Sequence, residues 1–167
     1  MKKTRVTKDD SQNGVLRVSI DELVPLFEER LAAGQTVEFS PMGTSMLPML
    51  RQGRDTVILS PPPEKLKKYD IPLYRRKNGK YILHRIVGAD ECYTCMGDNQ
   101  TEREQGIEKD QILAVVSAFK RGGRLHSVNE PLYRAYCVLW VASRPVRRIW
   151  RGLRRRAAEI IQKTKNR

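Results

Sequence analysis

The chain has 167 residues, 40% of them hydrophobic and 31% charged, which is enough for one folded domain with a core and short appendages. Its formal net charge is +13, but the segment from Arg134 to the end holds eleven Lys/Arg and one acid, Glu159, so this tail carries +10 and the rest of the chain only +3. The basicity therefore belongs to an appendage and not to the body.

Three classes of protein are disfavoured by the composition. An odd number of cysteines (Cys92, Cys95 and Cys137) argues against a disulfide framework. The first twenty residues hold no apolar run of the kind found in a signal peptide, and no stretch approaches the roughly 18–20 apolar residues of a membrane-spanning helix. We therefore expect a cytoplasmic protein, with peripheral contact to the inner membrane face left open.

The chain divides into four segments by composition and pattern. These are a disordered N-terminus at residues 1–14, a helical segment at 15–35, a β-rich domain at 36–130 and a basic amphipathic helical tail at 131–167.

The helical segment carries its own start and stop signals. Ser19 as N-cap and Glu22 three residues later fit a capping box, and Gly34 suits the end of the helix. Pro25 is expected to kink the helix or fray its start. An apolar stripe at helical spacing consists of Ile20, Leu23, Phe27 and Leu31.

Short β-prone runs separated by turn residues predict a mainly β domain. The expected strands are Thr36 to Ser40, Thr56 to Leu59, Ile71 to Lys77, Lys80 to Val87, Tyr93 to Met96, Ile112 to Lys120 and Leu125 to Val128. Asn78-Gly79 predicts a two-residue hairpin turn in which both residues have positive φ.

The tail is predicted to be helical with an interruption at Pro145, with apolar residues on one face and arginines on the other. Three interpretations stay open: a membrane-surface helix, a nucleic-acid-binding helix, and a basic helix packed on the domain. We do not expect nucleic acid to be the partner, because the tail contains no recognisable reading motif.

The segment Phe39 to Leu50 contains the candidate nucleophile, Ser45. A strand is expected to end there, Gly43 allows a sharp bend, and a serine just beyond a bend can project its hydroxyl beside backbone amides. Such a serine taken alone is more often an ordinary loop residue.

Five blocks in order give this serine more weight. They are Gly-Thr-Ser-Met-Leu-Pro at 43–48, Gly-Arg-Asp-Thr-Val at 53–57, Lys-Tyr-Asp-Ile-Pro-Leu-Tyr at 68–74, Tyr-Ile-Leu-His-Arg-Ile-Val at 81–87 and Gly-Asp-Asn at 97–99. Together they resemble the motifs of the signal peptidase I and SOS-repressor (LexA-like) serine peptidases, in the histidine-bearing branch of signal-peptidase-like proteins, here without a membrane-spanning helix. The resemblance implies a β-barrel-type catalytic domain.

The same resemblance implies a serine endopeptidase with Ser45 as nucleophile and His84 as base. Histidine has an unperturbed pKa of about 6.5 and is mostly neutral at cytoplasmic pH, so it can accept the serine proton. For the group that orients the imidazole we favour Asp98, with Asp110 as the alternative and Asp70 as a weaker one. Lys80 would lie about 13 Å along the strand and is not expected to replace His84.

The expected substrate is a peptide or protein that lies extended along the strand before Ser45. The residues expected to bind it are Phe39, Pro41, Met42, Gly43 and Thr44. Gly43 stands where signal peptidases often carry a serine, so Thr44 and the Ser45 amide are the expected oxyanion donors. We expect no cofactor or metal, and Cys92 and Cys95 to be ordinary cysteines.

The competing interpretation is a non-catalytic module that keeps the peptidase fold and binds a peptide or a membrane surface. The distance between the Ser45 hydroxyl and His84 is the relevant observation, since a catalytic pair lies within roughly 2.6–3.2 Å, or somewhat further in a free enzyme.

Overall fold

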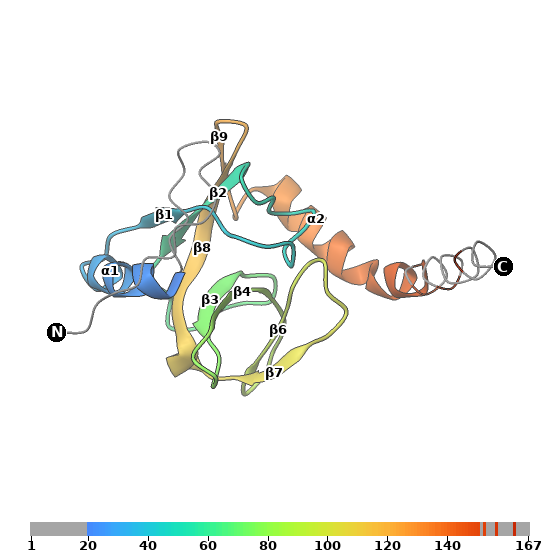
Figure 1. Cartoon of the computed structure of the whole chain (residues 1–167), viewed down its shortest axis with the longest axis horizontal. Coiled ribbons are helices and arrows are strands. Elements are labelled where there is room, and N and C mark those ends of the chain that lie inside the picture. The colour runs from blue at the N-terminus through green and yellow to red at the C-terminus, as the bar shows by residue number, and fades with distance from the viewer. Residues whose placement is uncertain (1–19, 151, 153–155, 157–161, 163–167) are drawn as a thin grey trace.

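The computed structural model describes residues 20–150, 152, 156 and 162 (Figure 1). Helix α1 spans Ile20–Ala32 and continues through Pro25, so the predicted kink at this proline does not interrupt the helix. The predicted N-cap, Ser19, and the N-terminal segment 1–14 lie outside the described residues.

The end of α1 follows the prediction from Gly34. Gly34 has φ of 72° and donates its N–H to Leu31 O at 3.0 Å, and Gln35 N–H donates to Arg30 O at 2.9 Å. This is the Schellman pattern of a glycine that ends a helix. The helix packs on the sheet through its buried apolar face, where the rings of Phe27 and Phe39 lie 5.6 Å apart.

Two antiparallel sheets make up the body, which confirms the mainly β prediction. The six-stranded sheet has the order β1-β2-β8-β3-β4, with β9 also paired to β8, and the three-stranded sheet has the order β5-β6-β7. The strands are β1 (Val37–Phe39), β2 (Asp55–Ser60), β3 (Pro72–Arg75), β4 (Tyr81–Leu83), β5 (Arg85–Ala89), β6 (Tyr93–Met96), β7 (Glu104–Ile107), β8 (Ile112–Arg121) and β9 (Arg124–Ser127).

The predicted β-barrel is not closed in the described part of the chain. Strands β1 and β4 each pair on one side only and form edges of the larger sheet, and no strand pairing joins that sheet to the smaller one. His84 lies between β4 and β5, at the point where the chain passes from the larger sheet to the smaller one.

The Asn78-Gly79 hairpin forms between β3 and β4, with a different turn from the one predicted. Only Gly79 has positive φ, at 85°, and the turn is held by Gly79 N–H to Arg76 O at 2.8 Å and Arg76 N–H to Lys80 O at 2.9 Å. One left-handed glycine is enough for this longer connection, whereas a two-residue type I′ turn needs two such residues. The register pairs Leu73 with Leu83 and Tyr74 with Ile82.

Strand β8 joins the two halves of the larger sheet because it pairs with β2, β3 and β9. Its buried residues alternate up to Val116, and the next buried position is Phe119. A register shift at Ile58/Leu59 leaves Ser117 as an extra residue and moves the burial pattern by one position.

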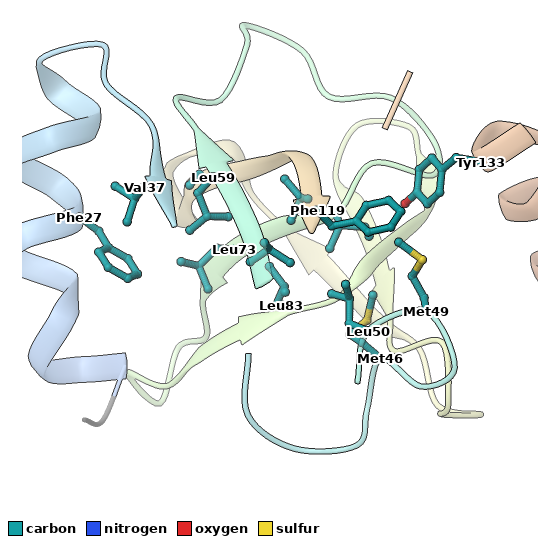
Figure 2. Close-up of a cluster of buried hydrophobic side chains, with 14 of the residues drawn as sticks. Phe27, Val37, Met46, Met49, Leu50, Leu59, Leu73, Leu83, Phe119 and Tyr133 are labelled. Carbon is teal, nitrogen blue, oxygen red and sulfur yellow. The ribbon is translucent and has the colours of Figure 1, made fainter. Parts of the chain in front are cut away.

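The main core lies between α1, the larger sheet and the turn that follows Ser45 (Figure 2). Met46, Met49 and Leu50 point from that turn into the core, together with Leu83 of β4. The nucleophile turn is therefore fixed by hydrophobic burial on the side away from Ser45.

The basic tail begins as helix α2 (Pro131–Ala142), and residues 144–150 continue as helix after a turn at Ser143. Pro131 at the first position is typical of a helix start. The helical prediction is confirmed over these residues. The interruption, expected at Pro145, lies two residues earlier, at Ser143. None of the helices in the described residues is both long and apolar enough to cross a membrane.

Candidate active site

Ser45 opens a tight turn held by local hydrogen bonds. Leu47 N–H donates to Thr44 O at 3.2 Å, and Leu50 N–H donates to Met46 O at 2.9 Å. Gly43, two residues before the serine, has φ of 91° and donates its N–H to Gln52 Oε1 at 2.8 Å. A residue with a Cβ is strained at such a φ, so the bend that places Ser45 depends on glycine.

His84 lies in the break between β4 and β5, and it is 2% exposed. Its Nδ1 atom faces two groups: Glu104 Oε1 at 3.2 Å and the Tyr74 hydroxyl at 3.4 Å. With Nδ1 turned toward these oxygens, Nε2 is the ring nitrogen on the opposite side. This arrangement favours the tautomer with hydrogen on Nδ1 and an accepting lone pair on Nε2.

Glu104 is fixed in place by two other side chains. Arg76 Nε donates to Glu104 Oε2 at 2.7 Å, Arg76 Nη2 bonds Oε1, and the Tyr74 hydroxyl donates to Oε2 at 3.0 Å. Burial alone would raise the pKa of Glu104, but the hydrogen bonds from Arg76 and Tyr74 outweigh it and the pKa is lowered. The group beside His84 is therefore a carboxylate.

Burial lowers the pKa of His84 below its usual value of 6.5, even though the charge of Glu104 acts in the opposite direction. Arg76 also lowers this pKa through its positive charge. The imidazole is consequently neutral at neutral pH, which is the form that a general base requires.

Ser45 and His84 line one small cavity, with a volume of about 100 Å³. The other lining residues are Pro41, Met42, Gly43, Met46, Leu50, Ile82 and Leu83. No hydrogen bond joins Ser45 Oγ to His84. The two residues line the same pocket without a hydrogen bond between them.

Three of the five residues predicted to bind substrate line this cavity: Pro41, Met42 and Gly43. Phe39 does not, because its ring packs on Phe27 beside the core. Thr44 lies at the surface, and its carbonyl accepts a hydrogen bond from Asn99 Nδ2 at 3.1 Å.

Asp98, predicted to orient His84, is instead bound to Arg85. Arg85 Nε donates to Asp98 Oδ1 at 2.8 Å and Nη2 donates to Oδ2 at 2.7 Å, and the two side chains are 0% and 1% exposed. Successive residues of an extended chain point in opposite directions, so Asp98 binds the neighbour of His84 and Glu104 holds the histidine. The alternatives also lie elsewhere: Asp70 caps Lys67 N–H at 2.7 Å, and Asp110 is exposed in the short 3₁₀ helix Lys109–Gln111.

The Gly97-Asp98-Asn99 loop supports the nucleophile through its backbone. Asn99 N–H donates to Ser45 O at 2.7 Å. A Cβ at Gly97 would lie 2.7 Å from the same carbonyl oxygen, so only glycine fits between the two loops. The structure thus gives this block a positioning role at Ser45.

Helix α2 and the helical residues 144–150 that follow it hold this loop from the other side. Trp140 Nε1 donates to Asp98 O at 3.2 Å, and Arg147 Nη1 donates to the same oxygen at 3.1 Å while its guanidinium lies 3.6 Å from the Trp140 ring centroid. Arg85 Nη1 reaches the helix as well, at the Tyr133 hydroxyl (3.1 Å) and Cys137 Sγ (3.0 Å). The start of the tail is therefore built into the support of the site.

Sequence reasoning missed Glu104 and Arg85. Glu104 opens β7, a strand that was not predicted because Glu-Gln-Gly-Ile has no run of β-prone residues. The only available signal for Arg85 was its place beside His84 in the fourth block. Cys92 is exposed and Cys95 is buried, and no cluster of metal-ligating side chains occurs among the residues described.

Comparison with known proteins identifies no relative: no protein-family model, no curated protein and no solved structure matches this chain.

Asp98→Asn is expected to destabilise the fold, because it leaves the buried charge of Arg85 without its partner. Removal of one member of such a pair costs about 3–5 kcal/mol in free energy of unfolding. Urea denaturation measures this, and Asp110→Asn, at an exposed position, is the control that should change little. A wild-type stability for Asp98→Asn would contradict this role.

Gly97→Ala is expected to displace the Ser45 carbonyl, because the added Cβ cannot share its space. Overpacking of this kind costs about 1–3 kcal/mol. The midpoint temperature of thermal unfolding and the rate at which Ser45 reacts with a serine-directed probe measure the effect. Both values should be lower than in the wild type. Gly88→Ala is the matched control, since its Cβ would meet the Thr94 side chain at no less than 3.4 Å, an ordinary contact.

Proposed function

We propose that this protein is a serine endopeptidase of the signal-peptidase-like kind, in which Ser45 is the nucleophile and His84 the general base. The observation that carries the proposal is the shared cavity: a serine in a turn after a glycine bend and a neutral, carboxylate-anchored histidine between β4 and β5 line the same pocket. The order of the five sequence blocks supports the same assignment.

In the proposed reaction, His84 Nε2 takes the proton of Ser45 Oγ as that oxygen attacks the peptide carbonyl carbon. Glu104, in place of the predicted Asp98, holds the ring through Nδ1 and stabilises the imidazolium that forms. The proton then passes from Nε2 to the leaving amine, and the peptide C–N bond breaks. Water, deprotonated by the same histidine, hydrolyses the acyl-enzyme and releases Ser45.

The negative oxygen of the tetrahedral intermediate needs hydrogen-bond donors. We assign this role to the Ser45 main-chain N–H, since Thr44, the other expected donor, does not line the cavity. The N–H of Gly43 is engaged by Gln52 and is not available for it. The Ser45 carbonyl is held by Asn99, which fixes the orientation of the peptide groups around the serine.

The cavity favours a small side chain next to the scissile bond. A volume of about 100 Å³ is well below the roughly 300–1,000 Å³ of typical small-molecule sites. Its walls are formed by the segment before Ser45 and by Ile82 and Leu83 of the edge strand β4. A substrate can therefore pair in extended form with an exposed strand edge and place one small residue in the pocket. A cytoplasmic location remains part of this proposal.

A serine-directed fluorophosphonate probe is expected to label the wild type and not Ser45→Ala. His84→Ala should lower the labelling rate by about 10²–10⁴-fold, the usual contribution of a general base. In-gel fluorescence over time measures both rates. Ser40→Ala and His126→Ala are matched controls, because they remove the same side chains outside the cavity and should be labelled like the wild type.

Equal labelling of the wild type and Ser45→Ala would end the peptidase proposal. The protein would then be better described as a peptide- or membrane-binding module, and its biological activity would survive both Ser45→Ala and His84→Ala.

The labelling rate is expected to fall as the pH drops through a midpoint below 6.5, because only neutral His84 accepts the proton and burial lowers its pKa. Glu104→Gln removes a negative charge that raises this pKa and leaves Arg76, which lowers it. The midpoint should therefore move further down, and the plateau rate should fall by about tenfold or more since the ring loses its anchor.

A pH series of labelling rates tests this, with circular dichroism at each pH to confirm that the protein is folded. Glu102→Gln removes a charge from an exposed position and should leave the profile unchanged. An unchanged midpoint in Glu104→Gln would rule out Glu104 as the group that positions His84.

A further inference from the structure

The helical tail has an apolar face that the protein does not cover. Leu132 is 86% exposed, Leu139 70% and Val146 67%. These residues are seven positions apart, two helical turns, and so lie on one side of the helix. Ile149 and Trp150, also exposed, lie three and four residues after Val146 and extend the same face. We call these five residues the tail stripe.

The opposite face of the helix is already occupied by the body of the protein. Tyr133 and Cys137 are buried against Arg85, and Trp140 and Arg147 contact the Asp98 carbonyl. Hydrogen bonds from Ser143 N–H to Leu139 O (2.9 Å) and from Arg147 N–H to Ser143 O (3.1 Å) carry the helix across the turn. The face turned away from the body is therefore apolar, whereas a surface helix normally carries polar residues on that face.

The charges of the helical tail are almost all positive. Residues 131–150 contain four arginines (Arg134, Arg144, Arg147 and Arg148) and no acid, and residues 151–167 add seven Lys/Arg against Glu159. Arg134 and Arg148 are exposed. An apolar stripe on a helical tail whose net charge is positive is complementary to a surface that is apolar inside and negatively charged outside.

We infer that the tail stripe docks on an anionic lipid bilayer, with its apolar side chains between the headgroups and the positive charge of the tail attracted to the lipid phosphates. Apolar burial and attraction to anionic headgroups act together in such binding, and Trp150 suits the interfacial region. A second copy of the chain fits less well, since pairing would bring two tails of +10 together.

This docking would place the proposed active site next to the membrane. The inner face of the helix holds the Asp98 carbonyl, and the next residue, Asn99, holds Ser45. The nucleophile turn therefore lies on the far side of a helix whose diameter is about 10–12 Å. Figure 1 shows α2 beginning beside the sheets and the helix running outward from them.

The test is flotation of the full chain with vesicles of phosphatidylglycerol and phosphatidylcholine, and with vesicles of phosphatidylcholine alone. We expect binding to the anionic vesicles, weakened in 1 M salt by screening. The double variant Leu139→Glu/Val146→Glu should lower the partition coefficient by about tenfold or more. The matched control Leu26→Glu/Leu125→Glu changes two exposed leucines outside the tail and should bind within about twofold of the wild type.

Tryptophan emission reports the depth of insertion, because the chain has two tryptophans and Trp140 packs on the inner face. A blue shift on vesicle addition should be lost in Trp150→Phe. Circular dichroism confirms that each variant is folded. Ser45→Ala should bind vesicles like the wild type, so failure of the peptidase proposal and failure of this one are separate results.

Three results would overturn the inference. The first is no binding, or equal binding to neutral and anionic vesicles. The second is an unchanged partition coefficient in Leu139→Glu/Val146→Glu. The third is that the wild type sediments as a dimer without lipid while this variant sediments as a monomer. The tail stripe would then be an interface between two copies.

Discussion

The buried pair of Arg85 and Asp98 is the interaction on which the rest of the site depends. One guanidinium joins the start of β5, the loop that carries Asp98 and the buried face of α2. Burial by itself would lower the pKa of Arg85, but the bond to Asp98 outweighs it and the pKa is raised, so the charge persists inside the protein. Two buried charges of this kind are tolerated only together. The pair therefore holds the loop in the position from which Asn99 N–H bonds Ser45 O.

His84 illustrates how adjacent residues take different roles. It and Arg85 are neighbours in the chain, and each has an acidic partner: Glu104 on one side, Asp98 on the other. Burial keeps the imidazole neutral, while the carboxylate of Glu104 lies where a positive charge would appear during proton transfer. A base that is neutral at rest and supported when charged suits catalysis at neutral pH.

Some expectations from sequence succeeded because their signals are local. Gly34 ends α1, Asn78-Gly79 marks the β3–β4 hairpin, and the tail is helical over its described part. The prediction that Asp98 orients His84 came from resemblance, and the contacts point to Glu104. No local pattern could have found Glu104, since it sits in a polar stretch and meets His84 only because β7 pairs with β6.

The resemblance supplied the candidate serine and histidine. The sequence by itself determined most of the strands, the glycine bend before Ser45 and the concentration of charge in the tail. These properties follow from backbone preferences and composition, which act over a few residues. The tertiary structure decided which acid meets which base, that the sheets do not close into a barrel, and which face of the tail helix is covered. Those outcomes depend on contacts between residues far apart in the chain, and short-range preferences carry no information about them.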